Sequence, residues 1–163
     1  MTKRLAIVVD IDETICTQFD VPVNVGIELL KQIDDERLTV FYVTARTEIC
    51  RVGTETFFAT YDLPGQSNIL FCPDSLDSFE HKRKQHEYLA RNFEVVASIG
   101  DSQEEEQASA AAGIPFCYVD PCNPAEGWLA LAARIAQVNG FSENNVAGLP
   151  TIQGSTFNRA SQT

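Results

Sequence analysis

Positive charge is scarce in this sequence of 163 residues. Its 12 Lys and Arg residues are outnumbered by 23 Asp and Glu residues, so the formal net charge is −11 at pH 7. Proteins whose main partner is duplex nucleic acid usually present a basic face. Nucleic acid is therefore a possible partner but not a favoured one, and a site for an anionic substrate would need a strong local cation.

Long apolar runs and a disulfide framework are also missing. No apolar segment approaches the length of a membrane span, and the stretch that begins MTKRLAIVVD is interrupted at Asp10, too early for a secretory signal. The five cysteines are odd in number and form no CxxC pair. They indicate reduced thiols that pack as small apolar residues. These absences predict a cytoplasmic protein without membrane contact.

The apolar segments that are present indicate an α/β fold. Five runs rich in Val, Ile and Phe predict buried strands at 4–10, 38–44, 68–72, 95–100 and 115–119. These runs are continuous rather than alternating, which is typical of parallel strands that are covered on both faces. Helical patterns lie between or after them, at 24–36, 47–60, 78–91, 102–112 and 124–139.

This alternation predicts a three-layer, doubly wound sheet of mainly parallel strands. One domain is expected to cover residues 1–139. Residues 140–163 lose the apolar periodicity, and we expect them to form an irregular or disordered tail.

Polar residues gather near the carboxyl ends of the predicted strands, where ligands bind in sheets of this kind. Seven of them are candidate site residues: Asp10 and Asp12 after the first strand, Thr44 and Arg46 after the second, Lys82 on the helix before the fourth, and Asp101 and Glu105 after the fourth. Phosphoryl transfer needs this set of groups, namely carboxylates, a hydroxyl and a cation that converge on one crevice.

The ordered motifs IVVDIDET, FYVT, a helical lysine and GDSQEE resemble the four motifs of the haloacid dehalogenase (HAD) superfamily, in its phosphatase branch. The resemblance covers about residues 4–120. It implies a HAD-like Rossmannoid fold and a Mg²⁺-dependent phosphomonoesterase, with a phosphorylated small molecule or an exposed phosphate of a macromolecule as substrate. Glu105 departs from the pattern, since aspartate is commoner there.

The resemblance implies a role for each matched residue. Asp10 would be the nucleophile that forms an aspartyl-phosphate, which splits a very slow reaction into two easier steps. Asp12 would act as general acid and then as general base. Thr44 and Lys82 would hold the phosphoryl oxygens.

The same resemblance implies a magnesium site. Its ligands would be Asp10, the backbone carbonyl of Asp12, and Asp101, with Glu105 as a further acid nearby. Mg²⁺ prefers such hard oxygen ligands, and it would supply the local cation that the acidic composition requires.

Three of these assignments have alternatives. Glu105 forms a capping box with Ser102, so it either supports the metal or caps the helix. Lys82 lies on the apolar stripe of its helix and Lys84 does not, which favours Lys82. Arg46 can clamp a substrate phosphate or carboxylate, or it can be an ordinary surface arginine.

Many HAD relatives carry a cap domain, and this chain has no room for one. The gaps from Asp12 to Thr44 and from Thr44 to Lys82 each fit one helix, one strand and loops. A capless, open site is expected, with a short flap at residues 17–24 (TQFDVPVN). Such a site admits large substrates and can also be covered by a partner subunit in an oligomer.

Two other functions stay open. The sequence DIDET also resembles acid-phosphatase-like and polynucleotide-phosphatase-like branches. The secreted acid phosphatases carry export signals, so that identity is not transferred here. The alternatives are a nucleic-acid 3′-phosphatase of polynucleotide-phosphatase type and a non-catalytic HAD-fold module that binds or regulates.

Overall fold

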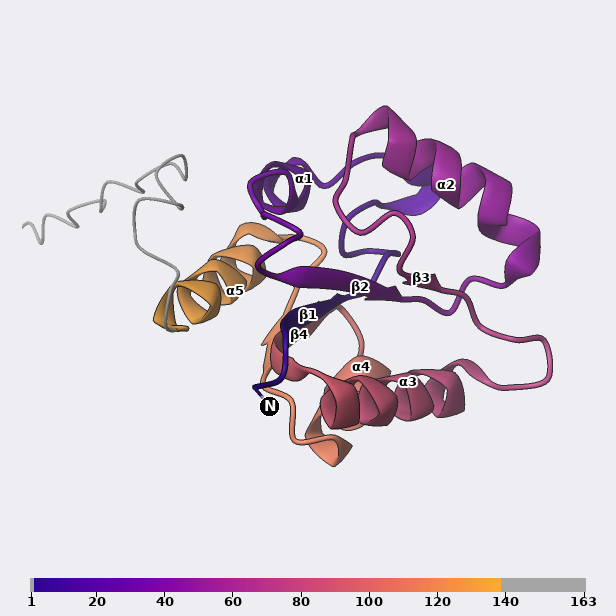
Figure 1. The fold of residues 1–163 in the computed structure, drawn as a ribbon. Helices are drawn as coiled ribbons and strands as arrows, with labels where there is room; N and C mark the ends of the chain where they lie inside the picture. The colour runs from indigo at the N-terminus through magenta and orange to yellow at the C-terminus, as the bar shows by residue number, and fades with distance from the viewer. Residues whose placement is uncertain (1, 139–163) are drawn as a thin grey trace, which may run out of the picture.

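Five parallel strands form the centre of the protein (Figure 1). The computed structural model describes residues 2–138, and the tail predicted at 140–163 lies outside them. Within residues 2–138 the strand order is β3-β2-β1-β4-β5 and every pair is parallel. The strands are β1 (Leu5–Val9), β2 (Thr39–Val43), β3 (Ile69–Leu70), β4 (Glu94–Gly100) and β5 (Phe116–Tyr118). All five lie where the sequence predicts strands.

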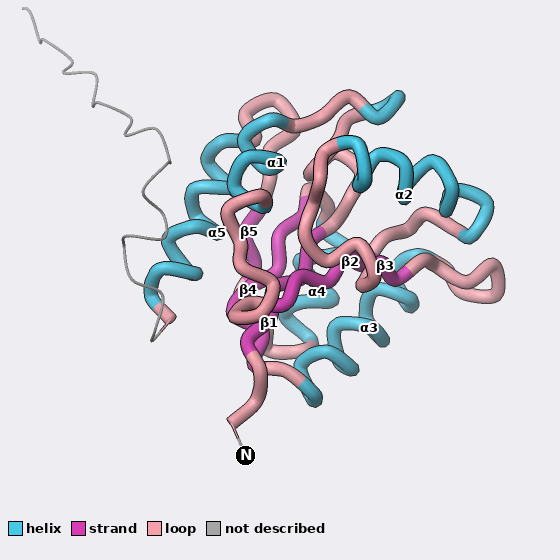
Figure 2. Tube along the Cα trace, turned by 45° about the horizontal axis from the view of Figure 1, so that its top comes forward, coloured by secondary structure: helices cyan, strands magenta, loops and turns pink. Residues whose placement is uncertain are grey.

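Helices cover both faces of this sheet, as Figures 1 and 2 show. They are α1 (Asn24–Leu30), α2 (Arg51–Thr60), α3 (Ser78–Asn92), α4 (Gln103–Ala111) and α5 (Ala125–Gln137), with short 3-10 turns η1 (Gln18–Asp20) and η2 (Glu48–Cys50). α1, α2 and α5 pack on one face, and α3 and α4 pack on the other. This arrangement confirms the predicted three-layer, doubly wound α/β fold.

The strands are continuously apolar because both faces are covered. On β1, Ile7 and Val9 belong to the larger core cluster beneath α1, α2 and α5, whereas Val8 belongs to the smaller cluster beneath α3. Successive side chains of a strand point to opposite faces. Burial on both faces therefore requires an apolar residue at every position, which is the pattern that the sequence shows.

The first helix is shorter than the sequence predicts. The apolar spacing indicates a helix over 24–36, but α1 ends at Leu30 and turns follow it. The carboxylate of Asp34 accepts a hydrogen bond from the amide of Glu36 at 3.0 Å, and its carbonyl accepts from Leu38 at 2.9 Å. Asp favours such local turns, and this one occupies the last residues of the predicted helix, after α1 has already ended.

The segments that would hold a cap domain are fully described and contain none. The chain forms η1, α1 and β2 between Asp12 and Thr44, and η2, α2 and β3 between Thr44 and Lys82. The predicted absence of a cap is thus confirmed. All five cysteines are free thiols. No helix within residues 2–138 has both the length and the apolar character that a membrane crossing requires.

Candidate active site

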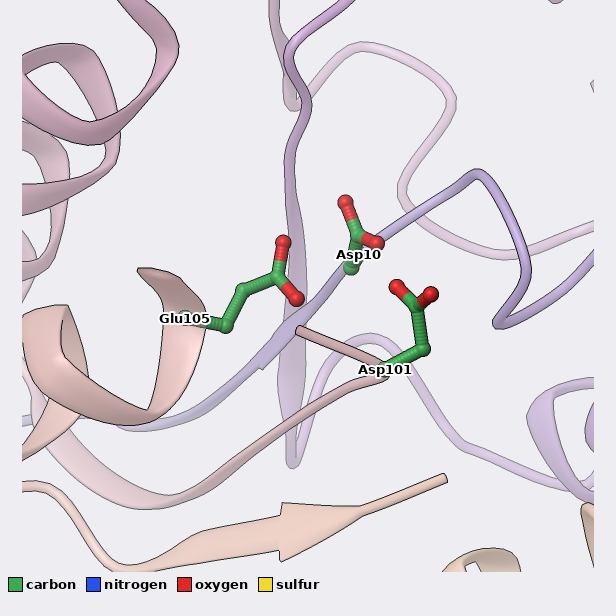
Figure 3. A group of neighbouring side chains, drawn as sticks. All are labelled: Asp10, Asp101 and Glu105. Carbon is green, nitrogen blue, oxygen red and sulfur yellow. The ribbon is translucent and has the colours of Figure 1, made fainter. Parts of the chain in front are cut away.

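Three carboxylates converge at the carboxyl ends of the two central strands. Asp10 directly follows β1 and is buried, and its amide donates to the carbonyl of Ile99 on β4 at 3.0 Å. Asp101 follows β4, and Glu105 lies on the first turn of α4. Figure 3 shows the three side chains pointing toward one another, and one oxygen from each lies within 4.8 Å of the other two.

Lys82 brings the one ammonium group that contacts this cluster among the described residues. Its Nζ lies 3.4 Å from Oδ1 of Asp10 and also forms an ion pair with Oε1 of Glu105. Lys82 is buried on α3, whereas Lys84 is half exposed and pairs only with Glu80 of the same helix. The structure therefore places Lys82, and not Lys84, at the carboxylate cluster.

Burial governs the electrostatics of this cluster. It raises the pKa of Asp10 from its ordinary value of 3.8 to about 7, while the ammonium of Lys82 acts in the opposite direction. Burial also raises the pKa of Asp101. Three carboxylates against one ammonium leave a surplus of negative charge in a poorly solvated place, which favours either protonation or a bound cation.

The donor set fits Mg²⁺. All three candidate ligands are carboxylate oxygens, the chemistry this ion prefers, and they lie close enough to share one ion. Asp10 and Asp101 would bind the metal, and Glu105 would be a further acid nearby. The backbone carbonyl of Asp12 is the fourth ligand implied by the sequence resemblance, and that assignment stays a prediction.

Glu105 caps its helix and also belongs to the carboxylate cluster. Its Oε2 accepts from the amide of Ser102 at 3.0 Å and from the Ser102 hydroxyl at 2.8 Å. The Ser102 hydroxyl in turn accepts from the Glu105 amide, which completes the predicted capping box. Since Oε1 pairs with Lys82, both oxygens already have partners, so a metal would reach Glu105 through water or by displacing Lys82.

Gly100 makes room for this arrangement. A Cβ atom at position 100 would lie only 2.5 Å from Oε2 of Glu105. The glycine of the GD motif thus lets the glutamate fold back over the end of β4, beside Asp101.

Two threonines lie in the loops that follow β1 and β2, at the same edge of the sheet as the cluster. Thr44, at the end of β2, is fully buried, and its Oγ1 accepts a hydrogen bond from the amide of Arg46 at 3.1 Å. Its hydroxyl hydrogen can therefore be donated to a bound group. Thr14 donates from Oγ1 to Oδ2 of Asp10 at 3.4 Å.

Trp128 supports the loop that carries Asp10 and Asp12. Its indole N–H donates to the carbonyl of Thr14 at 3.2 Å, although 114 residues separate the two. The sequence shows nothing that links these positions.

The candidate acid–base residue, Asp12, is held by Arg46. The Nε atom of Arg46 lies 3.1 Å from both carboxylate oxygens of Asp12, and its Nη2 lies 2.8 Å from Oδ1. These hydrogen bonds raise the pKa of Arg46 above its ordinary range. The guanidinium also pairs with Asp20 at 2.8 Å. Sequence reasoning places Asp20 in the flap but does not identify it as a site residue.

Comparison with known proteins supports the fold. No family model matches the chain, and neither does any curated protein sequence. Among solved structures, the class C acid phosphatase from Bacillus anthracis is similar with a TM-score of 0.57 and 17% identity, over 93% of this chain and 81% of that chain. The same phosphatase with tungstate bound has a TM-score of 0.55 and 16% identity, with the same coverage. At these identities the similarity shows a shared fold, the doubly wound α/β sheet described above.

Proposed function

We propose that the protein is a Mg²⁺-dependent phosphomonoesterase that works through an aspartyl-phosphate on Asp10. One observation carries this proposal. Asp10 lies buried at the end of the central strand β1, with the ammonium of Lys82 at 3.4 Å and the carboxylates of Asp101 and Glu105 facing it. A candidate nucleophile, a fixed cation and carboxylates that could hold a metal ion meet there in one place.

The first half of the reaction transfers the phosphoryl group to the protein. A carboxylate oxygen of Asp10 attacks phosphorus while the bond from phosphorus to the leaving oxygen breaks. Asp12 donates a proton to that oxygen, so the alcohol leaves uncharged. Thr44 and Lys82 hold the phosphoryl oxygens as charge develops on them.

The second half returns the protein to its starting state. Asp12, now a carboxylate, takes a proton from a water molecule, and the resulting hydroxide attacks phosphorus. The bond between phosphorus and Asp10 breaks and inorganic phosphate leaves. Mg²⁺, when bound, offsets the repulsion between the anionic nucleophile and the anionic ester.

Two further observations support a phosphate ester as the substrate. The phosphatase of similar fold binds tungstate, a tetrahedral oxyanion with the shape of phosphate. The described segments contain no cap domain that would limit the size of the substrate, so we propose that the ester is a small molecule or an exposed phosphate on a macromolecule.

Hydrolysis of p-nitrophenyl phosphate, with and without Mg²⁺, tests the proposal. We expect turnover that depends on Mg²⁺ in the natural chain and disappears in Asp10→Asn. Asp62→Asn is a suitable control because it makes the same change of charge at an exposed residue after α2. Mg²⁺ binding without turnover of any ester, including a 3′-phosphorylated oligonucleotide, would indicate a non-catalytic module instead.

A further inference from the structure

The guanidinium of Arg46 lies between carboxylates from two different loops. Its Nη2 is 2.8 Å from Oδ1 of Asp12, in the loop after β1, and 2.8 Å from Oδ1 of Asp20, in the flap. Only 15% of the Arg46 side chain is exposed, compared with 52% for Asp12 and 43% for Asp20. A largely buried cation therefore holds two acids that are themselves about half exposed.

The rest of the fold fixes Arg46 in this position. Its amide donates to Oγ1 of Thr44 at 3.1 Å, and its carbonyl accepts from the amide of Cys72 at 2.8 Å. Its Nη1 donates to Oγ1 of Thr54 on α2 at 3.0 Å. All three nitrogens of the guanidinium thus bond to groups of the chain itself. This disfavours the alternative in which Arg46 clamps a substrate phosphate.

The flap is a closed loop that is joined to the rest of the fold through the side chain of Asp20. Asp20 has a backbone φ of 56°, in the left-handed region that residues other than Gly, Asn and Asp rarely adopt. Backbone hydrogen bonds close the loop around it, from Thr17 to the carbonyl of Val21 and from Val23 to the carbonyl of Ile15, both at 2.8 Å. The side chain of Asp20 then connects this closed loop to Arg46.

We propose that Arg46 and Asp20 form a latch that fastens the flap (17–24) to the loop after β2 and orients Asp12 over the site. Asp20 and Arg46 are positioning residues in this account. A half-exposed carboxylate has several rotamers, and a guanidinium that contacts both of its oxygens selects one of them. Reaction rates depend steeply on such orientation. The part of the proposal that concerns Asp12 rests on the proposed function, whereas the part that concerns the flap does not.

Asp20→Asn weakens the latch by removing its negative charge, with little other change. Asparagine has the same shape and tolerates the left-handed conformation, so only the charge and the ion pair are lost. Asp62→Asn is the matched control, because Asp62 also has a left-handed φ, of 50°, and lies exposed after α2. Both variants remove one negative charge.

Amide hydrogen exchange of Thr17 and Val23, measured without substrate, tests the latch directly. We expect both amides to exchange up to about fivefold faster in Asp20→Asn than in Asp62→Asn, because the loss of one partly exposed ion pair shifts a local opening equilibrium by about that factor. Equal exchange in the two variants would overturn the latch. This result does not depend on any catalytic activity.

Kinetics then separate a latch from a phosphate clamp. The latch predicts that Asp20→Asn lowers kcat by about tenfold while KM stays close to that of Asp62→Asn, because the orientation of Asp12 is lost and phosphate contacts are kept. A clamp predicts a lower KM instead, since Arg46 would be released to the substrate. That second result would overturn the latch. If no variant hydrolyses any ester, the proposed function fails, and the exchange data still decide whether the flap is latched.

Discussion

The ammonium nitrogen of Lys82 lies 3.4 Å from Oδ1 of Asp10, and only 5% and 6% of these two side chains are exposed. Seventy-two residues separate them in the sequence. A buried charge that loses its partner is costly. The contact therefore ties the stability of the metal-free fold to the same groups that are proposed to carry out the chemistry.

Replacing Lys82 by Met should affect both activity and stability. Lys82→Met leaves the buried carboxylates of Asp10 and Glu105 without their cation. We expect the metal-free protein to lose about 3 kcal/mol of unfolding free energy and kcat/KM to fall by about 100-fold. Urea unfolding and steady-state kinetics measure the two effects. Lys84→Met, on the exposed side of α3, serves as the control, and equal behaviour of the two variants would contradict the assignment of Lys82.

The raised pKa of Asp10 predicts a specific dependence of stability on pH. Its pKa is about 7 in the folded protein against an ordinary value of 3.8, so the folded state binds this proton more tightly than the unfolded state. The stabilisation is complete below about pH 4 and is lost as the pH rises through about 7. In the presence of a chelator, the melting temperature of the natural chain should fall relative to Asp10→Asn across this range.

The difference between these two proteins reports on Asp10 together with its interaction with Asp101. Burial lowers the pKa of His86 to about 4 and also lowers that of His81, and both proteins contain these residues, so their contributions largely cancel. A difference in melting temperature that stays constant from about pH 4 to about pH 8 would contradict the raised pKa.

Trp128 should report on metal binding. It is the single tryptophan of the chain, and its indole N–H bonds to the carbonyl of Thr14 in the loop that carries Asp10. We expect Mg²⁺ to change its fluorescence, and Asp101→Asn to weaken the apparent affinity by about tenfold or more, because ligand charge sets the affinity of such sites. A titration in which Asp101→Asn binds as tightly as the natural chain would place the metal elsewhere.

Two glycines should respond to alanine in opposite directions. A Cβ atom at Gly127 would collide with the backbone carbonyl of Tyr118, whereas one at Gly53, within α2, would meet nothing within 4 Å. We expect Gly127→Ala to lower the unfolding free energy by about 1–3 kcal/mol and Gly53→Ala to raise it by about 0.5–1 kcal/mol. Urea unfolding of the two variants side by side checks both signs.

The sequence predicts the sheet and the position of the carboxylate cluster well, for physical reasons. Strands buried on both faces must be apolar throughout, and the carboxyl ends of parallel strands meet at one edge of the sheet. The sequence could therefore place Asp10 and Asp101 together, and the apolar stripe of its helix favoured Lys82 over Lys84 as the cation beside them. The predicted extent of α1 was wrong, because the apolar spacing of Ile33 does not show that α1 ends at Leu30 and that Asp34 forms a turn after it.

Contacts between loops could not be predicted from the sequence. The flap has no periodicity, so nothing indicates that Asp20 reaches Arg46, 26 residues away. Sequence reasoning also treats capping and metal support by Glu105 as alternatives. The structure shows that one carboxylate can cap α4 with one oxygen and face Lys82 with the other.

Trapping the phosphorylated protein tests the central claim most directly. The protein would be mixed with Mg²⁺ and a phosphate ester, quenched during turnover and treated with borohydride, which reduces an aspartyl-phosphate to homoserine. The account predicts homoserine at position 10, found by mass spectrometry of the peptide that contains LAIVVDIDET, and none in Asp10→Asn. Turnover without modification of Asp10, or with the modification at another acid, would contradict it.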